Sequence, residues 1–369
     1  MLTIGDIESP NSIIGWWNSK ANERQPYIYQ SLLTATHEDT ENINLIFGEN
    51  EEVRGLSLTT DDTDAIKLNN IGFSSEGYRM ASFKNYKMMN EKRRNQIKQA
   101  VANNPDQAEI EALTRTQYQD PASLLDFALY TREKLFVQAL TTGKIALASN
   151  DLTYGVDFHM PAEHVQTVGT PWGTMDSSPL DDMDQAAQGV LNDNGTVIAY
   201  ALMNGNTFRK IVRSGEVVNS LSLGKTSNNV ALPQADVKDL MTNTTNITPL
   251  IYNKADKNGR FIPDDTVVLI PNGSLGRLAW TDTNEALGLI GESSAQVSTT
   301  ADGITLTTYR NVEPVGTMVK ATQKFVPAFD KVRNVVVMNV GQTKAGAPTN
   351  VKATPTNDGA TVTADAPKN

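Results

Sequence analysis

One long amphipathic helix that passes directly into a strand constrains the fold of this chain more than any other feature. Pro121 suits the first helical position, where its missing N–H costs nothing, and Asp120 before it is a favourable N-cap residue. Apolar residues then recur at helical spacing up to Leu140, and Gly143 follows where a left-handed C-cap is expected. The sequence therefore predicts a helix over residues 121–142.

The rest of the chain predicts a mixture of helices and strands. Apolar runs over residues 197–203 and 266–270 have the pattern of strands that are buried on both faces. A helix is expected over residues 179–191, and the long helix is expected to pack its apolar stripe on a sheet built from residues 144–158 and 317–340. Asn-Gly or Asp-Gly pairs predict tight turns at 194–195, 204–205, 258–259, 272–273 and 302–303. The predicted fold class is α+β with mixed sheets.

The two ends of the chain predict segments without a core of their own. Residues 1–36 look irregular, yet they contain large aromatic side chains that we expect to dock on this subunit or on a neighbour. Residues 37–85 alternate short β-prone runs with turns, which indicates an extended hairpin that needs a partner surface. Residues 86–119 are polar and helix-prone. Residues 341–369, rich in Thr, Ala and Pro, are expected to form a flexible tail.

The charge of the chain is acidic and unevenly distributed. Its 32 Lys and Arg against 42 Asp and Glu give a formal net charge of −10, which argues against general binding of phosphate. Residues 37–64 are acidic, with Arg54 as their basic residue, whereas residues 79–98 are rich in Lys and Arg. Opposite signs favour pairing between neighbouring copies, although two solvated faces explain the pattern about as well. The candidate residues for contacts between subunits are Trp16, Trp17, Tyr27, Glu49, Glu51, Glu52, Arg54, Arg93, Arg94 and Arg132.

The sequence offers few groups for catalysis or metal binding. The chain has no cysteine, which excludes a disulfide framework, a thiolate metal site and a cysteine nucleophile. The segment from His159 to His164 resembles an inverted zincin motif, but its spacing is one residue too long and Pro161 breaks the helix that the motif needs. We therefore expect no catalytic, cofactor-binding or metal-binding residues. A signal peptide and an apolar run long enough to cross a bilayer are also missing, so no membrane partner is expected.

Several blocks of sequence resemble one family, and they occur in that family's order. The blocks are Arg132 to Ile145, Tyr154 to Phe158, Pro161 to His164, Pro179 to Met183, Phe261 to Gly276, and Lys331 to Val340. Together they resemble the major capsid proteins of tailed bacteriophages of the lambda E type over roughly residues 30–340. The succession of the blocks is more specific than any single block.

The resemblance implies the Hong Kong 97 capsid fold and a division of the chain into its usual parts. In this fold a long spine helix lies in a peripheral domain, and a separate axial domain of mixed sheet and short helices lies at the capsomer centre. The implied parts are an N-terminal arm over 1–36, an extended loop over 37–85, a peripheral domain over 86–178 with its spine helix at 121–142, an axial domain over 179–310, return strands over 311–340 and a flexible tail over 341–369.

The resemblance also implies assembly rather than catalysis. Copies of the chain would form hexamers and pentamers that close into an icosahedral virion shell around double-stranded DNA, without sequence-specific binding and without a cofactor. The helix start near residue 121 leaves no room for a large fused scaffolding domain, so a separate scaffolding protein is expected, together with a portal and possible decoration protein. Assembly is expected in the cytoplasm of the host bacterium. The alternatives are an encapsulin-like cargo shell of the same fold and, more weakly, a carboxylate-dependent enzyme.

Overall fold

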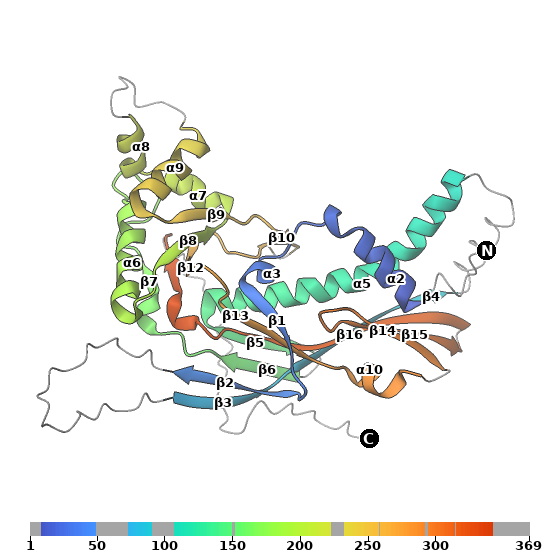
Figure 1. Ribbon diagram of the computed structural model, residues 1–369. Coiled ribbons are helices and arrows are strands. Elements are labelled where there is room, and N and C mark those ends of the chain that lie inside the picture. The colour runs from blue at the N-terminus through green and yellow to red at the C-terminus, as the bar shows by residue number, and fades with distance from the viewer. Residues whose placement is uncertain are drawn as a thin grey trace, which may run out of the picture. The chain divides into compact units, whose positions relative to one another are not determined.

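The computed structural model describes residues 9–48, 73–90, 107–149, 152–222, 232–257, 259–291, 294–313 and 315–341, which divide into two compact units (Figure 1). Unit 1 takes its described residues from Met1–Ile43, Tyr78–Phe136 and Gly276–Ala328. Unit 2 takes its described residues from Asn44–Gly77, Val137–Leu275 and Phe329–Asn369. Each unit is thus assembled from segments that lie far apart in the sequence.

Unit 1 is built on a six-stranded sheet whose central strand is the long strand β16. The strands are β1 (Leu33–His37), β13 (Gly276–Thr281), β16 (Val315–Ala328), β15 (Thr305–Val312), β14 (Ala295–Thr299) and β4 (Ala81–Asn90). They follow the order β1-β13-β16-β15-β14, and β4 pairs with β16 outside this path. The pairs β13–β16 and β15–β16 are antiparallel, and β1 runs parallel to β13. The helix α10 (Asn284–Leu289) lies next to β14 and β15.

The N-terminal segment contains helices from residue 10 onward, so the expected irregular structure over residues 1–36 is wrong for its described part, whereas its role as an arm stays a prediction. It forms α2 (Pro10–Ser19), a 3-10 turn (Ala21–Glu23), α3 (Tyr29–Leu32) and then β1. Ser9 caps α2, because its Oγ accepts a hydrogen bond of 3.2 Å from the backbone N–H of Ser12. Ser9 and Pro10 are both sequence signals of a helix start. The prediction rested only on the aromatic content of the segment and therefore did not include this helix.

The predicted hairpin over residues 37–85 is shorter than expected. Its stem is the two-stranded sheet of β2 (Asn42–Gly48) and β3 (Phe73–Arg79), and the residues that would form its tip, 49–72, lie outside the described residues. Residues 81–90 are not part of a hairpin or a helix. They form β4, which pairs with β16 over its whole length. This partner lies more than 200 residues away, so no local pattern could indicate it.

The predicted helix is correct at its C-terminal end and wrong at its start. The helix α5 runs over Gln107–Thr142, and Gly143 ends it with φ of 69°. Residues 107–120 contain no glycine or proline and are rich in good helix formers, so the helix continues through them. Pro121 therefore lies inside the helix, where it removes one backbone hydrogen bond. The buried side chains around it, Ala122, Leu124 and Leu125, supply packing that offsets this cost.

Replacing Pro121 with alanine tests the longer helix. We expect this variant to raise the free energy of unfolding by about 1 kcal/mol or more, because alanine restores the hydrogen bond and removes the clash of the proline ring. Urea unfolding followed by circular dichroism measures the difference. A helix that began at residue 121 would instead lose stability on this change, because proline favours the first helical position.

The long helix packs on the sheet of unit 1, but the predicted composition of that sheet is wrong. Within unit 1, the side-chain amide of Gln323 on β16 donates 3.1 Å to the carbonyl of Ala128 on α5. Residues 317–340 do not form one sheet, because a turn and a 3-10 helix (Val332–Asn334) follow β16 and lead to β17 (Val336–Asn339) in the sheet of unit 2. The strands β5 (Lys144–Ser149) and β6 (Leu152–Asp157) form a separate two-stranded sheet.

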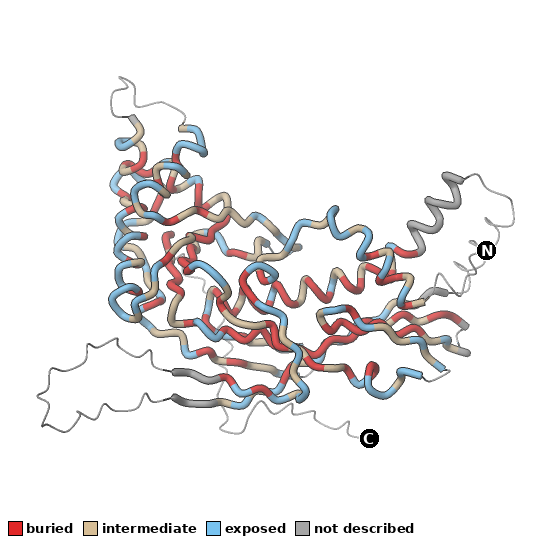
Figure 2. Tube along the Cα trace, viewed as in Figure 1, coloured by how far each residue is buried: buried red, intermediate tan, exposed pale blue. Residues whose placement is uncertain are grey.

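Unit 2 contains a five-stranded sheet covered by helices. Its strands are β7 (Val165–Thr167), β17, β12 (Thr266–Pro271), β8 (Ile198–Met203) and β9 (Thr248–Ile251), in this order. The helices are α6 (Pro179–Asn194), α7 (Gly205–Val212), α8 (Gly215–Ser222) and α9 (Gln234–Thr245). The strands β8 and β12 pair antiparallel in the middle and are largely buried, which confirms the two predicted apolar strands (Figure 2). A short hairpin of β10 (Ala255–Asp256) and β11 (Gly259–Arg260) surrounds the predicted turn at 258–259.

Two of the predicted tight turns are helix ends. Gly195 ends α6 in the left-handed region with φ of 69°, and Asn204 caps α7 by accepting 2.9 Å from the backbone N–H of Thr207. Glycine and asparagine serve these caps for the same conformational reasons that make them common in hairpins. No helix in the described parts of the chain is both long enough and apolar enough to cross a membrane.

Candidate assembly surfaces

The aromatic residues of the N-terminal segment contact the subunit itself. Trp17 is 8% exposed and its indole N–H donates 2.8 Å to Asp126 on α5, while the guanidinium carbon of Arg24 lies 3.7 Å from the centre of the Trp17 ring. Trp16 stacks on Tyr118 of α5 with 6.0 Å between the ring centres. Of the three aromatic candidates, Trp16 and Tyr27 are half-buried and have exposed surface that is available to a second copy, whereas Trp17 has little exposed surface. Their role between subunits stays a prediction.

Arg132 is buried completely inside unit 1. Its Nε donates 2.9 Å to the side-chain oxygen of Gln323, its Nη1 donates 2.9 Å to the carboxylate of Asp302, and its Nη2 donates 2.7 Å to the carbonyl of Asp302. The guanidinium also lies over the ring of Phe325, 5.5 Å from its centre. The neighbouring Glu133, also fully buried, accepts the backbone N–H of Tyr29 at 3.1 Å. Arg132 therefore joins α5 to the sheet, and any influence on neighbouring copies acts through the shape of the subunit.

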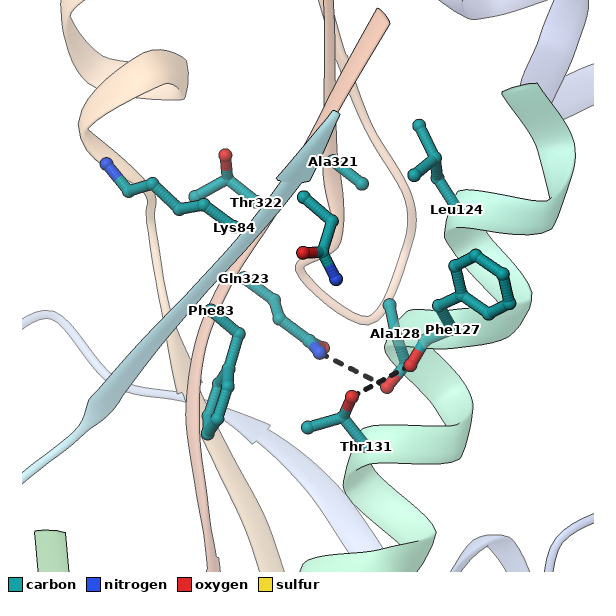
Figure 3. Close-up of a pocket in the computed structure, with 10 residues that line it drawn as sticks. Phe83, Lys84, Leu124, Phe127, Ala128, Thr131, Ala321, Thr322 and Gln323 are labelled. Atoms are coloured by element: carbon teal, nitrogen blue, oxygen red, sulfur yellow. Dashed lines mark hydrogen bonds between the residues drawn. The ribbon is translucent and has the colours of Figure 1, made fainter. Parts of the chain in front are cut away.

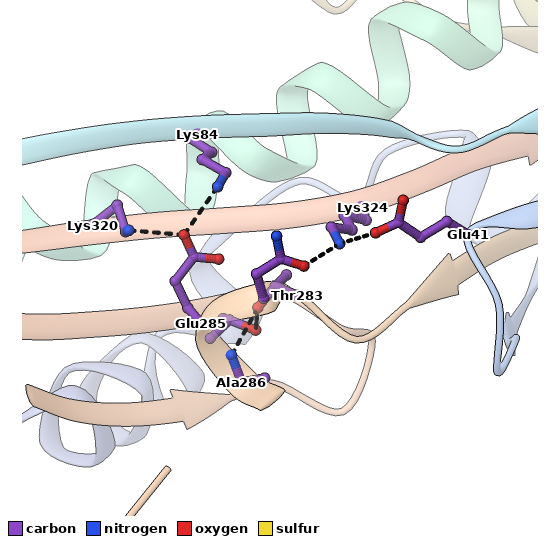
Figure 4. Close-up of polar contacts among 9 residues, drawn as sticks. Glu41, Lys84, Thr283, Glu285, Ala286, Lys320 and Lys324 are labelled. Carbon is purple, nitrogen blue, oxygen red and sulfur yellow. Dashed lines mark hydrogen bonds and ion pairs between the residues drawn. The ribbon is translucent and has the colours of Figure 1, made fainter. Parts of the chain in front are cut away.

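A cluster of ion pairs holds α10 on the sheet (Figure 4). Glu285 on α10 is nearly buried and accepts hydrogen bonds from Lys320 on β16 at 2.8 Å and from Lys84 on β4 at 3.1 Å. Burial alone raises the pKa of Glu285, but the hydrogen bonds from its own backbone N–H and from the two lysines outweigh burial and lower the pKa to about 2. Thr283 caps α10 by accepting 3.2 Å from the N–H of Ala286. Glu285 is therefore charged under all physiological conditions.

A second ion cluster lies on the same sheet. Glu41 accepts hydrogen bonds from Lys324 and from Arg79, the latter at 2.8 Å, and Lys324 also contacts Asn284 at 2.7 Å. These bonds from Lys324 and then Arg79 lower the pKa of Glu41 below its usual value. Glu41 belongs to the acidic segment and Arg79 to the basic one. Part of the pairing that we expected between copies therefore occurs within one subunit.

The sequence did not predict these ion clusters as a site. The segment from Thr281 to Glu285 carries hydroxyls and carboxylates, but residues 281–295 contain no Lys or Arg that could pair with them. The available signal was the alternation of Lys320 and Lys324, which places both lysines on one face of a strand. The remaining candidates for inter-subunit contact, Glu49, Glu51, Glu52, Arg54, Arg93 and Arg94, lie outside the described residues.

The segment from His159 to His164 leaves β6 as a loop and ends in a 3-10 helix over Ala162–His164. His159 has φ of 52° and its Nε2 lies 3.1 Å from a carboxylate oxygen of Glu76, whereas His164 is buried with its Nε2 3.5 Å from Asp193. The two histidines thus face different carboxylates. Among the described residues, no group of three or more His, Asp or Glu is arranged to hold a metal ion.

A hollow lies between β4 and α5 in unit 1 (Figure 3). Its apolar walls come from Phe83 on β4 and from Leu124, Phe127 and Ala128 on α5. Phe127 is 48% exposed, so this wall of the hollow is accessible to solvent. The polar part of the lining includes Gln323, which is already bonded to the helix. The hollow is partly open to solvent, a shape that suits an inserted side chain better than an enclosed small molecule.

Comparisons with known proteins agree with this architecture. The chain resembles a putative capsid protein of an Escherichia coli prophage, with 14% identity, a TM-score of 0.58 and coverage of 90% of this chain and 99% of that one. A phage-related protein from Bordetella bronchiseptica matches with 11% identity, a TM-score of 0.53 and coverage of 90% and 98%. The capsid of cyanophage A-1(L) matches with 11% identity, a TM-score of 0.51 and coverage of 83% and 90%.

These structural similarities show that the chain has the Hong Kong 97-type capsid fold. Because the sequence identities are low, the similarities are evidence for the fold alone. Comparison with curated protein sequences gives no match. The sequence pattern of one family, described as phage major capsid protein E, matches residues 11–340 and so covers most of the chain, including both units. The chain therefore belongs to the phage major capsid protein E family, whose members are structural proteins of the virion.

Proposed function

We propose that this major capsid protein assembles into hexamers and pentamers that close into an icosahedral shell around double-stranded DNA. The observation that supports this most is the family match over residues 11–340, because it spans most of the N-terminal segment, the long helix and the two larger sheets. The net charge of −10 suits a shell that must not hold its DNA tightly. Assembly takes place in the host cytoplasm and uses a separate scaffolding protein and a portal, with a decoration protein as a possible later addition.

The domain division belongs to the same proposal. The axial domain over residues 179–310 corresponds in part to unit 2, with its helices α6 to α9, but β13 to β15 from this range lie in unit 1. The proposed peripheral domain over residues 86–178 divides between the units, because its described residues up to Phe136 belong to unit 1 and those from Val137 belong to unit 2. The tail over 341–369 has no assigned role.

Expression of the chain with its neighbouring scaffolding gene tests the proposed function. We expect closed shells with masses in the MDa range by negative-stain microscopy and light scattering. A protein that stays monomeric with and without scaffold, over a range of salt and protein concentrations, would contradict the proposal. Shells that enclose a cargo enzyme rather than DNA would favour the encapsulin-like alternative.

Charge reversal in the acidic segment gives a second test. Replacing Glu49, Glu51 and Glu52 together with lysine is expected to suppress shell formation more strongly at low salt than at high salt, because salt screens exposed charges. Shell yield at 50 mM and 500 mM salt (about 14 Å and 4 Å Debye length) measures the effect. A triple change to glutamine serves as the control that removes charge without reversing it. Equal yields at both salts would reject pairing between charged segments of different copies.

A further inference from the structure

The sequence contains four Asn-Gly pairs, at residues 194–195, 204–205, 258–259 and 272–273. In such a pair the backbone nitrogen of the glycine can attack the side-chain Cγ of the asparagine, because glycine has no Cβ to shield that nitrogen. The attack expels the side-chain nitrogen as ammonia and closes a succinimide ring, which water then opens. The reaction needs an unrestrained asparagine side chain and an unbonded glycine N–H, so the fold decides which pair reacts.

Hydrogen bonds restrain the pair of Asn194 and Gly195. The side-chain nitrogen of Asn194 donates 2.6 Å to the carbonyl of Arg333, and its Oδ1 accepts 3.0 Å from the backbone N–H of Thr196. The N–H of Gly195 donates 2.9 Å to the carbonyl of Leu191 at the end of α6. Ring closure at this pair would have to break these three bonds.

The pair of Asn204 and Gly205 is restrained in the same way and is also buried. Asn204 has no exposed surface; its side-chain nitrogen donates 2.6 Å to Asp264, and its Oδ1 accepts 2.9 Å from the backbone N–H of Thr207. The N–H of Gly205 donates 2.7 Å to the side chain of Asn253. Because these bonds cap α7, ring closure would require the start of this helix to open.

The pair of Asn272 and Gly273 has no such restraint. Both residues are exposed in the turn between β12 and β13, and neither makes a hydrogen bond to any other described residue. Gly273 has φ of 96°, and no atom lies within 4 Å of the place that a Cβ would occupy. The glycine nitrogen and the asparagine side chain are therefore free to meet. Asn258 lies outside the described residues.

We infer that Asn272 is a site of spontaneous deamidation in the folded subunit, with water as the co-reactant. A bond forms between the backbone nitrogen of Gly273 and Cγ of Asn272. The bond from Cγ to the side-chain nitrogen breaks, and this nitrogen leaves as ammonia with the proton of the glycine N–H. Water then adds to one of the two ring carbonyls and breaks its bond to the ring nitrogen, which leaves aspartate or isoaspartate without any change of oxidation state.

The reaction changes both the charge and the backbone of this turn. Each event adds one negative charge to the formal net charge of −10. Isoaspartate also inserts one methylene into the backbone between β12 of unit 2 and β13 of unit 1. The reaction does not depend on shell assembly.

Peptide mapping by mass spectrometry tests the inference on folded subunits kept at mildly alkaline pH, which favours loss of the glycine N–H proton. We expect aspartate and isoaspartate to appear at Asn272, with conversion of Asn194 and Asn204 at least about tenfold slower, because these two must first open locally. The same chain unfolded in urea is the reference. There Asn194, Asn204 and Asn272 should convert at comparable rates, and Asn272 should react about as fast as it does in the folded subunit.

The variant Asn272→Gln is the control for direct hydrolysis of the side-chain amide. Glutamine has to close a larger and less favourable ring, so this variant should keep its amide at position 272. Loss of that amide at the rate of the unsubstituted protein would overturn the succinimide route.

Two further results would overturn the inference. One is conversion of Asn194 or Asn204 in folded subunits as fast as that of Asn272. The other is conversion of Asn272 at least about tenfold slower in the folded subunit than in urea, because the turn would then protect it. Each of these results would leave the proposed function intact, since the measurement is made on unassembled subunits.

Discussion

Replacing Arg132 with methionine is expected to lower the free energy of unfolding of the subunit by about 3 kcal/mol. The arginine side chain has no exposed surface and donates three hydrogen bonds, one to Gln323 and two to Asp302. Methionine fills a similar volume but removes the arginine donors to the side-chain oxygen of Gln323 and to the carbonyl of Asp302. The Asp302 side chain is 36% exposed, so water can replace the hydrogen bond that the arginine donated. The expected loss of stability therefore lies at the lower end of the range for breaking a buried ion pair.

Urea unfolding of unassembled subunits, followed by tryptophan fluorescence, measures this loss. Arg24→Met is the matched control, because Arg24 also lies near a carboxylate and an aromatic ring but its side chain is 27% exposed. We expect the control to cost less than about 1 kcal/mol. Arg132→Lys keeps the charge and should recover only part of the loss, since one ammonium cannot reproduce the planar fork of donors. Equal losses of stability in Arg132→Met and Arg24→Met would show that the buried hydrogen bonds of Arg132 stabilise the fold no more than the partly exposed contacts of Arg24.

Replacing Glu285 with glutamine is expected to cost about 2 kcal/mol at neutral pH, a value discounted because its partner Lys84 is half exposed to solvent. The pKa of Glu285 in the folded subunit is about 2, below the usual glutamate value of 4.5. The carboxylate therefore stabilises the fold fully above pH 4.5, and this contribution is lost as the pH falls from 4.5 toward 2. The difference between the wild type and Glu285→Gln should accordingly be constant above pH 5 and narrow below it.

Unfolding curves at a series of pH values from 7 to 3.5 follow this difference, and Glu163→Gln provides a control at an exposed carboxylate of unit 2. A difference that stays the same down to pH 3.5 would mean that Glu285 acts through packing rather than charge. We further expect Glu285→Gln to loosen α10, because the helix would lose its ion pairs with Lys84 and Lys320 and keep its Thr283 cap and the hydrogen bond from Lys324 to Asn284. Faster hydrogen exchange confined to residues 283–289 would detect this loosening.

The parts of the fold that the sequence predicted are those encoded by local signals. Gly143 ends the long helix at a residue where only a left-handed conformation fits, and the two runs of consecutive apolar residues became β8 and β12 in the centre of a sheet. The start of the helix was missed because Pro121 is a favourable first helical residue, whereas in this chain it lies inside the helix despite its cost there. Local chemistry could not separate these two possibilities, and the packing around Leu124 and Leu125 decided between them.

For the candidate site, in contrast, the tertiary structure supplied most of the information. The acidic and basic segments were visible in the sequence, but their partners were not. Lys84 meets Glu285 across 201 residues of chain, and Arg132 meets Gln323 across 191. No short-range periodicity carries such information, because the pairing of β4 with β16 and the docking of α10 bring these groups together.

The sequence alone determined the α+β class, the C-terminal end of the spine helix, the two buried strands of unit 2 and, through the order of its blocks, the family of capsid proteins. Only the tertiary structure decided which lysines meet Glu285 and where residues 317–340 divide between two sheets. The physical reason is that helix caps and apolar runs act over a few residues, whereas strand pairing and ion-pair geometry depend on which distant segments the packed core brings side by side.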